Sequence, residues 1–259
     1  MNKEAKAIIL YHRSYRKIAG SMWGFFLQFL LIAVPLSLVI VFFYPQITQL
    51  VCVIARALLA PYYPDDALRI IQIPFIMGPT SILDLPSKYP SVLFCTINAL
   101  VSLILLVLLP AVKNAKHLYI FVIVILFINF ISSLFFMFFP YRFPYEVVDY
   151  SEFYMKQQIN IWFFVPIIMG LAILPLPSDL TSKSATLLIT FCYSLVFGTT
   201  RYVVFLFILT KASLLYMAVL FFVLGSLVDF IYIVGIYSVH VTRLAKKMKG
   251  DFASWKWLY

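Results

Sequence analysis

Charged residues are scarce in this chain of 259 residues: only 12% are charged, whereas 64% are apolar. A soluble globular domain is about one quarter charged and about half apolar, so the composition excludes that class. Basic residues outnumber acidic ones by 20 to 10. The basic residues cluster beside apolar segments, where such residues orient membrane helices and meet anionic lipid. We therefore expect the lipid bilayer, and no nucleic acid, as a partner.

Residue types that build catalytic and metal sites are equally few, with three cysteines and three histidines. An odd number of cysteines without close spacing indicates neither a disulfide framework nor a metal site. The chain contains no HExxH, GxSxG or glycine-rich phosphate-binding motif. We expect no metal and no cofactor, and the sequence favours a non-catalytic protein.

Long apolar runs are abundant instead. A helix of about 20 residues crosses a hydrocarbon core about 30 Å thick, and segments in lipid must be helical because no water satisfies their backbone. The predicted fold class is all-α: residues 1–259 form a single integral membrane domain, a polytopic bundle of about six transmembrane helices. The expected spans are 20–44, 90–110, 118–139, 159–177, 184–210 and 212–240.

Charge distribution predicts the orientation of the bundle. If both termini are cytoplasmic, 13 of the 20 basic residues lie on the inner side, as the positive-inside rule requires. The very short loops favour a bacterial inner membrane. We expect the basic segment 1–19 and the basic, aromatic tail 241–259 to bind the inner surface. The expected anchors are Arg13, Arg16, Lys17, Arg243, Lys246, Lys247, Trp255 and Trp257.

The largest region outside the spans is 45–89. Apolar residues recur at helical spacing between Ile47 and Leu59, which predicts an amphipathic helix over 46–60 on the outer surface. The following stretch, 70–79, is apolar, broken by prolines and too short to span. It is interpreted as a re-entrant or surface-lying segment, either a cover over the bundle or a lid facing a substrate.

Two ionisable residues interrupt the expected spans. Arg201 lies in the outer third of its span, where its side chain either snorkels to the interface or binds a substrate or partner. Asp229 lies in the inner half of the last span, where it either meets a cation, such as Lys183, Lys113 or one from a partner subunit, or relays protons. Antiparallel helices separate Arg201 and Asp229 by roughly 10 Å or more in depth, so we expect no direct ion pair.

Polar residues on other spans are expected to join helices. Asn98 and Asn129 are interpreted as donors and acceptors of interhelical hydrogen bonds. Cys192 lies at a depth that His240 can reach from the neighbouring span, and we interpret this pair as structural. A transporter would use such polar side chains to line a water-filled path: Asn98, Asn129, Ser132, Ser194, Thr199 and Arg201.

The stretch around Cys95 carries a family resemblance. Phe94-Cys95-Thr96-Ile97-Asn98 opens a span at the outer face, and Ile128-Asn129-Phe130-Ile131 lies on the next span. Over about residues 45–160 this arrangement resembles exosortases and archaeosortases. The Ser-Gly that follows the family's cysteine, the arginine after its asparagine and its outer histidine are missing here. The resemblance implies a degenerate relative in which Cys95 is the remnant of a transpeptidase-type site.

Three functions remain open. The leading hypothesis is a non-catalytic integral membrane subunit of a cell-envelope assembly for secretion, polymer export or transport. Its aromatic-rich spans would pack against other membrane-protein subunits, with Arg201 and Asp229 as polar handles. The second hypothesis is a small-solute transporter or channel, and the third is the degenerate sortase-like protein with Cys95 at its outer face.

Overall fold

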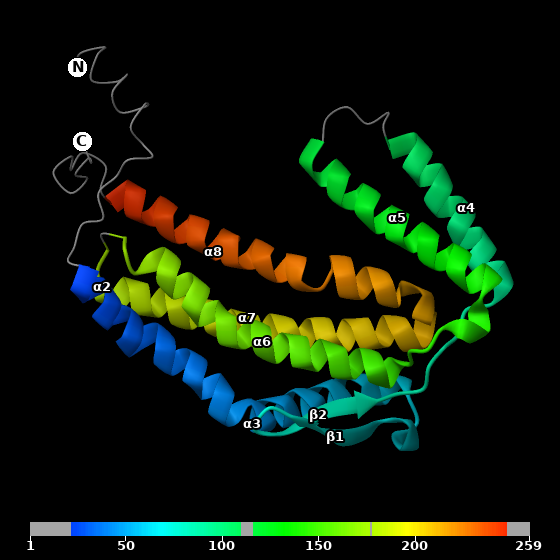
Figure 1. The fold of residues 1–259 in the computed structure, drawn as a ribbon, viewed down its shortest axis with the longest axis horizontal. Coiled ribbons are helices and arrows are strands. Elements are labelled where there is room, and N and C mark those ends of the chain that lie inside the picture. The colour runs from blue at the N-terminus through cyan, green and yellow to red at the C-terminus, as the bar shows by residue number, and fades with distance from the viewer. Residues whose placement is uncertain (1–21, 110–115, 177, 248–259) are drawn as a thin grey trace, which may run out of the picture. The chain divides into compact units, whose positions relative to one another are not determined.

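The computed structural model of the protein describes residues 22–109, 116–176 and 178–247 (Figure 1). Within these residues, five helices are long and apolar enough to cross a membrane. The predicted all-α class is confirmed, and the chain is an integral membrane protein. The remaining expected span corresponds to a shorter apolar helix, α4 (Val92–Leu108), whose 17 residues extend about 25 Å.

The chain forms two compact units, and we describe each by itself. Unit 1 consists of residues 1–40, 162–194 and 231–259, and unit 2 consists of residues 41–161 and 195–230. Four long helices contribute residues to both units. These helices are α3 (Val34–Leu59), α6 (Val147–Ile173), α7 (Leu180–Phe207) and α8 (Ser226–Lys247).

Unit 1 also contains α2 (Met22–Gln28), which continues into a π-helical stretch, Phe29–Ala33. Close packing requires a glycine at position 170 of α6, because a Cβ there would lie 2.7 Å from the Cβ of Ala33. The fully buried Trp162 donates a hydrogen bond from Nε1 to the carbonyl of Ser194. Small residues and one satisfied indole therefore join α6 to its neighbours.

Unit 2 contains an antiparallel β-hairpin that the sequence analysis did not predict. Strands β1 (Arg69–Phe75) and β2 (Gly78–Asp84) occupy the stretch expected to be re-entrant or surface-lying. Isoleucines favour strands, and Pro74 and Pro79 face each other one residue pair from the two-residue turn, in a sheet whose two strands are both edges and therefore tolerate proline. The expected amphipathic helix over 46–60 is helical, but it is the end of α3 and continues the first span without a break.

The hairpin is attached to helices of unit 2 through side-chain hydroxyls. Tyr44 Oη accepts a hydrogen bond from the Met77 amide at 3.0 Å and donates one to the Gly78 carbonyl at 2.9 Å. The amide of Ser81 donates to Thr48 Oγ1 at 3.3 Å. These bonds hold the turn and strand β2 against α3.

Helix α4 pairs with α5 (Lys116–Phe138). Asn98 donates to Ser133 Oγ at 2.8 Å, and Asn129 donates to Ser102 Oγ at 2.9 Å. The interhelical bonds expected of both asparagines are therefore present. The two bonds also show that the helices run antiparallel, because the later residue of α4, Ser102, pairs with the earlier residue of α5, Asn129.

The connection between α7 and α8 is irregular, whereas the expected spans 184–210 and 212–240 left room only for a minimal turn around residue 211. Two π-helical stretches, Ile208–Ala212 and Val219–Val223, flank a short 3₁₀ turn, and α8 begins only at Ser226. Ser213 is extended and ends the first stretch, after which the Leu214 amide donates to the Lys88 carbonyl. The break between Val223 and Ser226 therefore divides the segment 212–240, which was expected to be one straight span.

Tyr44→Phe tests the attachment of the hairpin. The change leaves the Met77 amide and the Gly78 carbonyl without their partner, so we expect a loss of about 1–3 kcal/mol in stability. Hydrogen exchange of the turn amides should accelerate, whereas the control Tyr141→Phe, at a side chain 99% exposed, should change nothing. Unchanged exchange in Tyr44→Phe would contradict the attachment.

Candidate functional site

Unit 2 encloses an ion pair between Arg201 of α7 and Asp229 of α8. Arg201 Nη2 lies 2.6 Å from Asp229 Oδ2, and both side chains are about 95% buried. This finding overturns three expectations: the two residues pair directly, Arg201 does not snorkel, and Asp229 has Arg201 as its cation. A buried charge needs such a partner because its transfer from water is otherwise very costly.

The guanidinium of Arg201 has five N–H donors and meets five acceptors. Nε donates to Tyr154 Oη at 2.9 Å, and Nη2 donates to Gln158 Oε1 at 2.7 Å as well as to Asp229. Nη1 faces the carbonyls of Gly225 at 2.7 Å and Leu224 at 3.4 Å. The charge is thus satisfied entirely by residues of unit 2.

Two glycines allow this approach. A Cβ at position 198 would lie 2.6 Å from the Gln158 side chain, and one at position 225 would lie 2.2 Å from the Phe221 carbonyl. Gly225 follows the second π-helical stretch, where the regular hydrogen-bond ladder ends. The break leaves its carbonyl available to Arg201, which explains why the connection is irregular at this point.

The same irregularity explains why the depth estimate was wrong. That estimate assumed two straight helices with ideal rise on either side of a minimal turn. The π-helical and 3₁₀ stretches instead change the path of the chain between Ile208 and Gly225, and Asp229 falls in the first turn of α8. The long side chain of Arg201 bridges the remaining difference in depth and reaches the Asp229 carboxylate.

Aromatic hydroxyls extend this cluster toward the hairpin. Tyr154 and Tyr202 stack with ring centroids 5.3 Å apart, and Tyr154 Oη donates to the Gly198 carbonyl. Tyr202 Oη accepts the Leu83 amide at 2.9 Å and bonds Ser151 Oγ. The cluster therefore links three long helices to β2, which is a structural arrangement.

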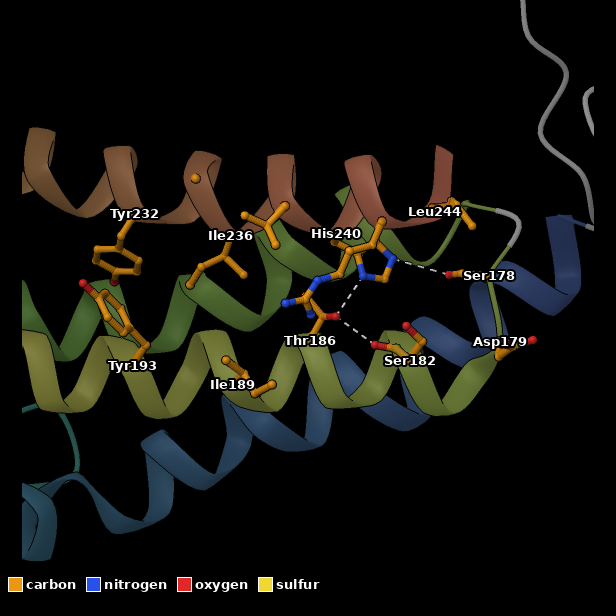
Figure 2. A pocket seen from close by; sticks show the side chains of 13 residues that line it. Ser178, Asp179, Ser182, Thr186, Ile189, Tyr193, Tyr232, Ile236, His240 and Leu244 are labelled. Carbon is orange, nitrogen blue, oxygen red and sulfur yellow. Dashed lines mark hydrogen bonds between the residues drawn. The ribbon is translucent and has the colours of Figure 1, made fainter. Parts of the chain in front are cut away.

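A cavity of about 800 Å³ lies in unit 1, between the beginning of α7 and the end of α8 (Figure 2). We call it the α7–α8 groove. Its volume is within the range of small-molecule sites, which are mostly apolar with a few polar groups. Its lining residues are Ser178, Asp179, Ser182, Thr186, Ile189, Tyr193, Tyr232, Gly235, Ile236, Val239, His240, Arg243 and Leu244.

The chemistry of the groove changes along its length. Figure 2 shows Tyr193, Tyr232, Ile189 and Ile236 toward one end and the polar side chains toward the other. The polar end is built from hydroxyls of α7 and its preceding turn, from His240 and from Arg243. An apolar end joined to a polar end is the surface that an amphiphilic ligand requires.

His240 organises the polar end. Its Nδ1 lies 2.8 Å from Thr186 Oγ1 and its Nε2 lies 3.5 Å from Ser178 Oγ. The expected structural pair with Cys192 is replaced by these contacts, and Cys192 is exposed. Lys183, one of the expected partners of Asp229, instead donates to the Leu174 carbonyl at 2.7 Å.

Gly235 is the unusual residue of the groove wall. It lies in the middle of α8, yet a Cβ added there would meet nothing within 4 Å. Glycine in a helix interior costs about 0.5–1 kcal/mol relative to alanine. Close packing explains Gly170 and Gly198 but not Gly235, whose absent side chain leaves space in the groove.

Cys95 is buried in α4, and His117, which belongs to the same unit, lies far from it. Thr96, its neighbour, contacts Met137 at the end of α5, whereas His117 lies near the beginning of that helix, about 30 Å away along its axis. A nucleophilic thiol needs a nearby base. The described structure therefore does not assemble the sortase-like site.

The residues proposed for a transport path have other surroundings in the described part of the chain. Asn98 and Asn129 bind the facing helix, and Arg201 is enclosed. None of the six lines the α7–α8 groove or a smaller aromatic cavity of about 290 Å³ beside Tyr150.

Of the expected membrane anchors, Arg243 lines the groove and Lys246 is exposed near the end of α8. Lys247 is the last residue of that helix. The remaining anchors lie outside the described residues: Arg13, Arg16, Lys17, Trp255 and Trp257.

Comparison with known proteins identifies no relative: no family model, no curated protein and no solved structure matches the chain. The functional interpretation of the α7–α8 groove therefore depends on the geometry of the groove alone. Sequence reasoning missed most of its polar wall, although a signal existed. Ser178, Ser182 and Thr186 recur every four residues, the spacing that aligns side chains on one helix face.

Asp229→Asn tests the buried ion pair. The change leaves the Arg201 charge buried without its counter-ion, so we expect a loss of about 3–5 kcal/mol in stability, measured by thermal or denaturant unfolding in detergent. The exposed carboxylate of Asp66 provides the matched control, because Asp66→Asn should shift stability by less than about 0.5 kcal/mol. Equal stability of the two variants would show that the pair is not needed.

Proposed function

We propose that the protein binds a membrane amphiphile, a lipid or lipid-linked molecule, in the α7–α8 groove. The observation that carries the proposal is the open space at Gly235, in the wall of a groove that is apolar at one end and polar at the other. A soluble ligand would have no use for the apolar end. A pure hydrocarbon would leave the polar end without a partner.

The length of the groove supports the same class of ligand. Asp179 and Tyr193 are 14 residues apart along α7 and its preceding turn, which corresponds to about 21 Å. Half of a hydrocarbon core about 30 Å thick, together with one interfacial layer, measures about 20–22 Å. The groove therefore matches one leaflet, with the polar end at the interface and the apolar end among the acyl chains.

The position of the ligand follows from the charge count. Both helix ends that form the polar end of the groove are on the side assigned to the cytoplasm by the positive-inside rule. We therefore propose a ligand drawn from the inner leaflet, in a bacterial inner membrane. Basic pockets between transmembrane helices are known to hold lipid headgroups on this side.

A role as a subunit of an envelope assembly remains a prediction. The sequence-based hypothesis used Arg201 and Asp229 as polar handles for partner subunits. In the structure, these two residues form an ion pair with each other inside unit 2. A partner would instead meet apolar and aromatic side chains, of which α4 exposes many. A subunit of an envelope assembly can also bind lipid. The α7–α8 groove supports lipid binding more directly than any described feature supports solute transport.

Gly235→Phe tests the proposed function. The ring would occupy open space in the groove, so binding should be lost while the fold is retained. A phospholipid with a photoreactive group on its acyl chain, supplied in vesicles, should label the α7 and α8 peptides beside Ile189 and Ile236 of the natural protein. Excess unlabelled phospholipid should compete with this labelling. We expect at least a tenfold loss of competed labelling in Gly235→Phe.

Gly235→Ala is the matched control, because it adds one methyl group, leaves most of the groove open and stabilises the helix slightly. It should label like the natural protein. Equal labelling of Gly235→Phe and Gly235→Ala, with both variants folded by thermal unfolding, would refute the proposal.

A further inference from the structure

The proton positions around His240 follow from two short contacts of Thr186. Thr186 Oγ1 lies 2.8 Å from the Ser182 carbonyl, which can only accept a hydrogen bond, and 2.8 Å from His240 Nδ1. The hydroxyl has one proton, and only its donation to the carbonyl makes both contacts favourable, because Nδ1–H then donates to Oγ1. A neutral imidazole carries one ring proton, so Nε2 of His240 keeps its lone pair.

That lone pair meets the hydroxyl of Ser178 (Figure 2). The distance of 3.5 Å from Nε2 to Ser178 Oγ is long for a hydrogen bond, but the contact of a nucleophile with its base is often long before substrate binds. Thr186 orients the ring from its other nitrogen. The three side chains therefore have the arrangement of nucleophile, base and orienting group by which serine enzymes activate a hydroxyl, and all three line the cavity.

Resting on the proposed function, we propose that the α7–α8 groove is also a serine acyl-transfer site, whose substrate is an ester-linked acyl chain of the bound amphiphile. The ester carbonyls of a membrane lipid lie between its acyl chains and its headgroup. The groove changes from apolar to polar at the corresponding point. Ile236 lies one turn before His240 on the apolar side of the ring, and Ser178 lies on the polar side (Figure 2).

The reaction has two steps. In the first, Ser178 Oγ bonds to the carbonyl carbon of the ester and its proton passes to His240 Nε2. The ester C–O bond then breaks, and the departing alcohol oxygen takes the proton from Nε2. In the second step, water attacks the acyl group on Ser178 with His240 again as the base, and the fatty acid leaves as Ser178 regains its proton. Ser178 and His240 are catalytic residues in this scheme, and Thr186 is a positioning residue.

A fluorophosphonate with a long alkyl chain tests the site, because it reacts with an activated serine whatever the natural ester is. Ser178 Oγ displaces fluoride from phosphorus, and mass spectrometry of the full chain in lipid vesicles locates the adduct. We expect an adduct on Ser178 of the natural protein, none in Ser178→Ala, and labelling about 100-fold slower in His240→Gln. The matched control is Ser184→Ala, on α7 but outside the groove, which should label like the natural protein.

Variants of Thr186 separate an orienting role from a structural one. Thr186→Val keeps the shape of the side chain but removes its hydroxyl, so labelling should slow about tenfold, the effect of one lost hydrogen bond. Thr186→Ser keeps the hydroxyl and should label like the natural protein. Equal labelling rates of these two variants, both folded by thermal unfolding, would contradict the proton assignment.

Vesicles of phosphatidylethanolamine test the substrate class. The natural protein should release fatty acid and lysophospholipid from them, and Ser178→Ala should release neither. An adduct on Ser178 without release would overturn the ester substrate.

The outcomes separate this inference from the proposed function. If no adduct forms on Ser178 while Gly235→Phe abolishes competed photolabelling, the amphiphile site stands and the acyl-transfer site is wrong. If the adduct forms but Gly235→Phe photolabels like the natural protein, the serine is reactive without an amphiphile site. The proposed function then fails, and the substrate class fails with it.

Discussion

The guanidinium of Arg201 is the constraint on which unit 2 depends. A permanent charge in an apolar bundle requires an acceptor for every donor, and the protein supplies five, from two helices (α6 and α8) and the helix break before α8. Glycines at 198 and 225 are needed because other residues would fill the approach. The irregular backbone between α7 and α8 thus makes the carbonyls of Leu224 and Gly225 available to accept hydrogen bonds from this side chain.

Glycine serves two opposite purposes in the protein. At positions 170 and 198 its small size lets neighbouring groups approach closely. At position 235, by contrast, the missing side chain leaves open space. In unit 2, Arg201 and Asp229 are paired with each other, and in unit 1, Arg243 and Asp179 line a cavity. Because membrane helices gain little by burying apolar surface, such polar and steric details determine where they pack and where they leave space.

Hydropathy was sufficient to predict the membrane class, the helical fold and nearly every span, because lipid imposes helices on long apolar runs. The hydrogen bonds of Asn98 and Asn129 were likewise predictable, since polar side chains on spans have few other partners. The Arg201–Asp229 pair was not, because its geometry depends on π-helical stretches that residue counting treats as regular. The hairpin was missed because its isoleucine run resembles a short apolar segment of any kind, and strand pairing depends on Tyr44, Thr48 and Tyr202 elsewhere in the chain.

The hydroxyl of Tyr202 that accepts the Leu83 amide has a consequence for biosynthesis. The two residues are 119 positions apart, so β2 leaves the ribosome long before its partner on α7 exists. Contacts of such separation form late, after the intervening loop entropy has been overcome. The hairpin therefore completes its attachment only after α7 has been inserted, whereas its bonds to α3 can form earlier, because Tyr44 and Thr48 precede the hairpin in the chain.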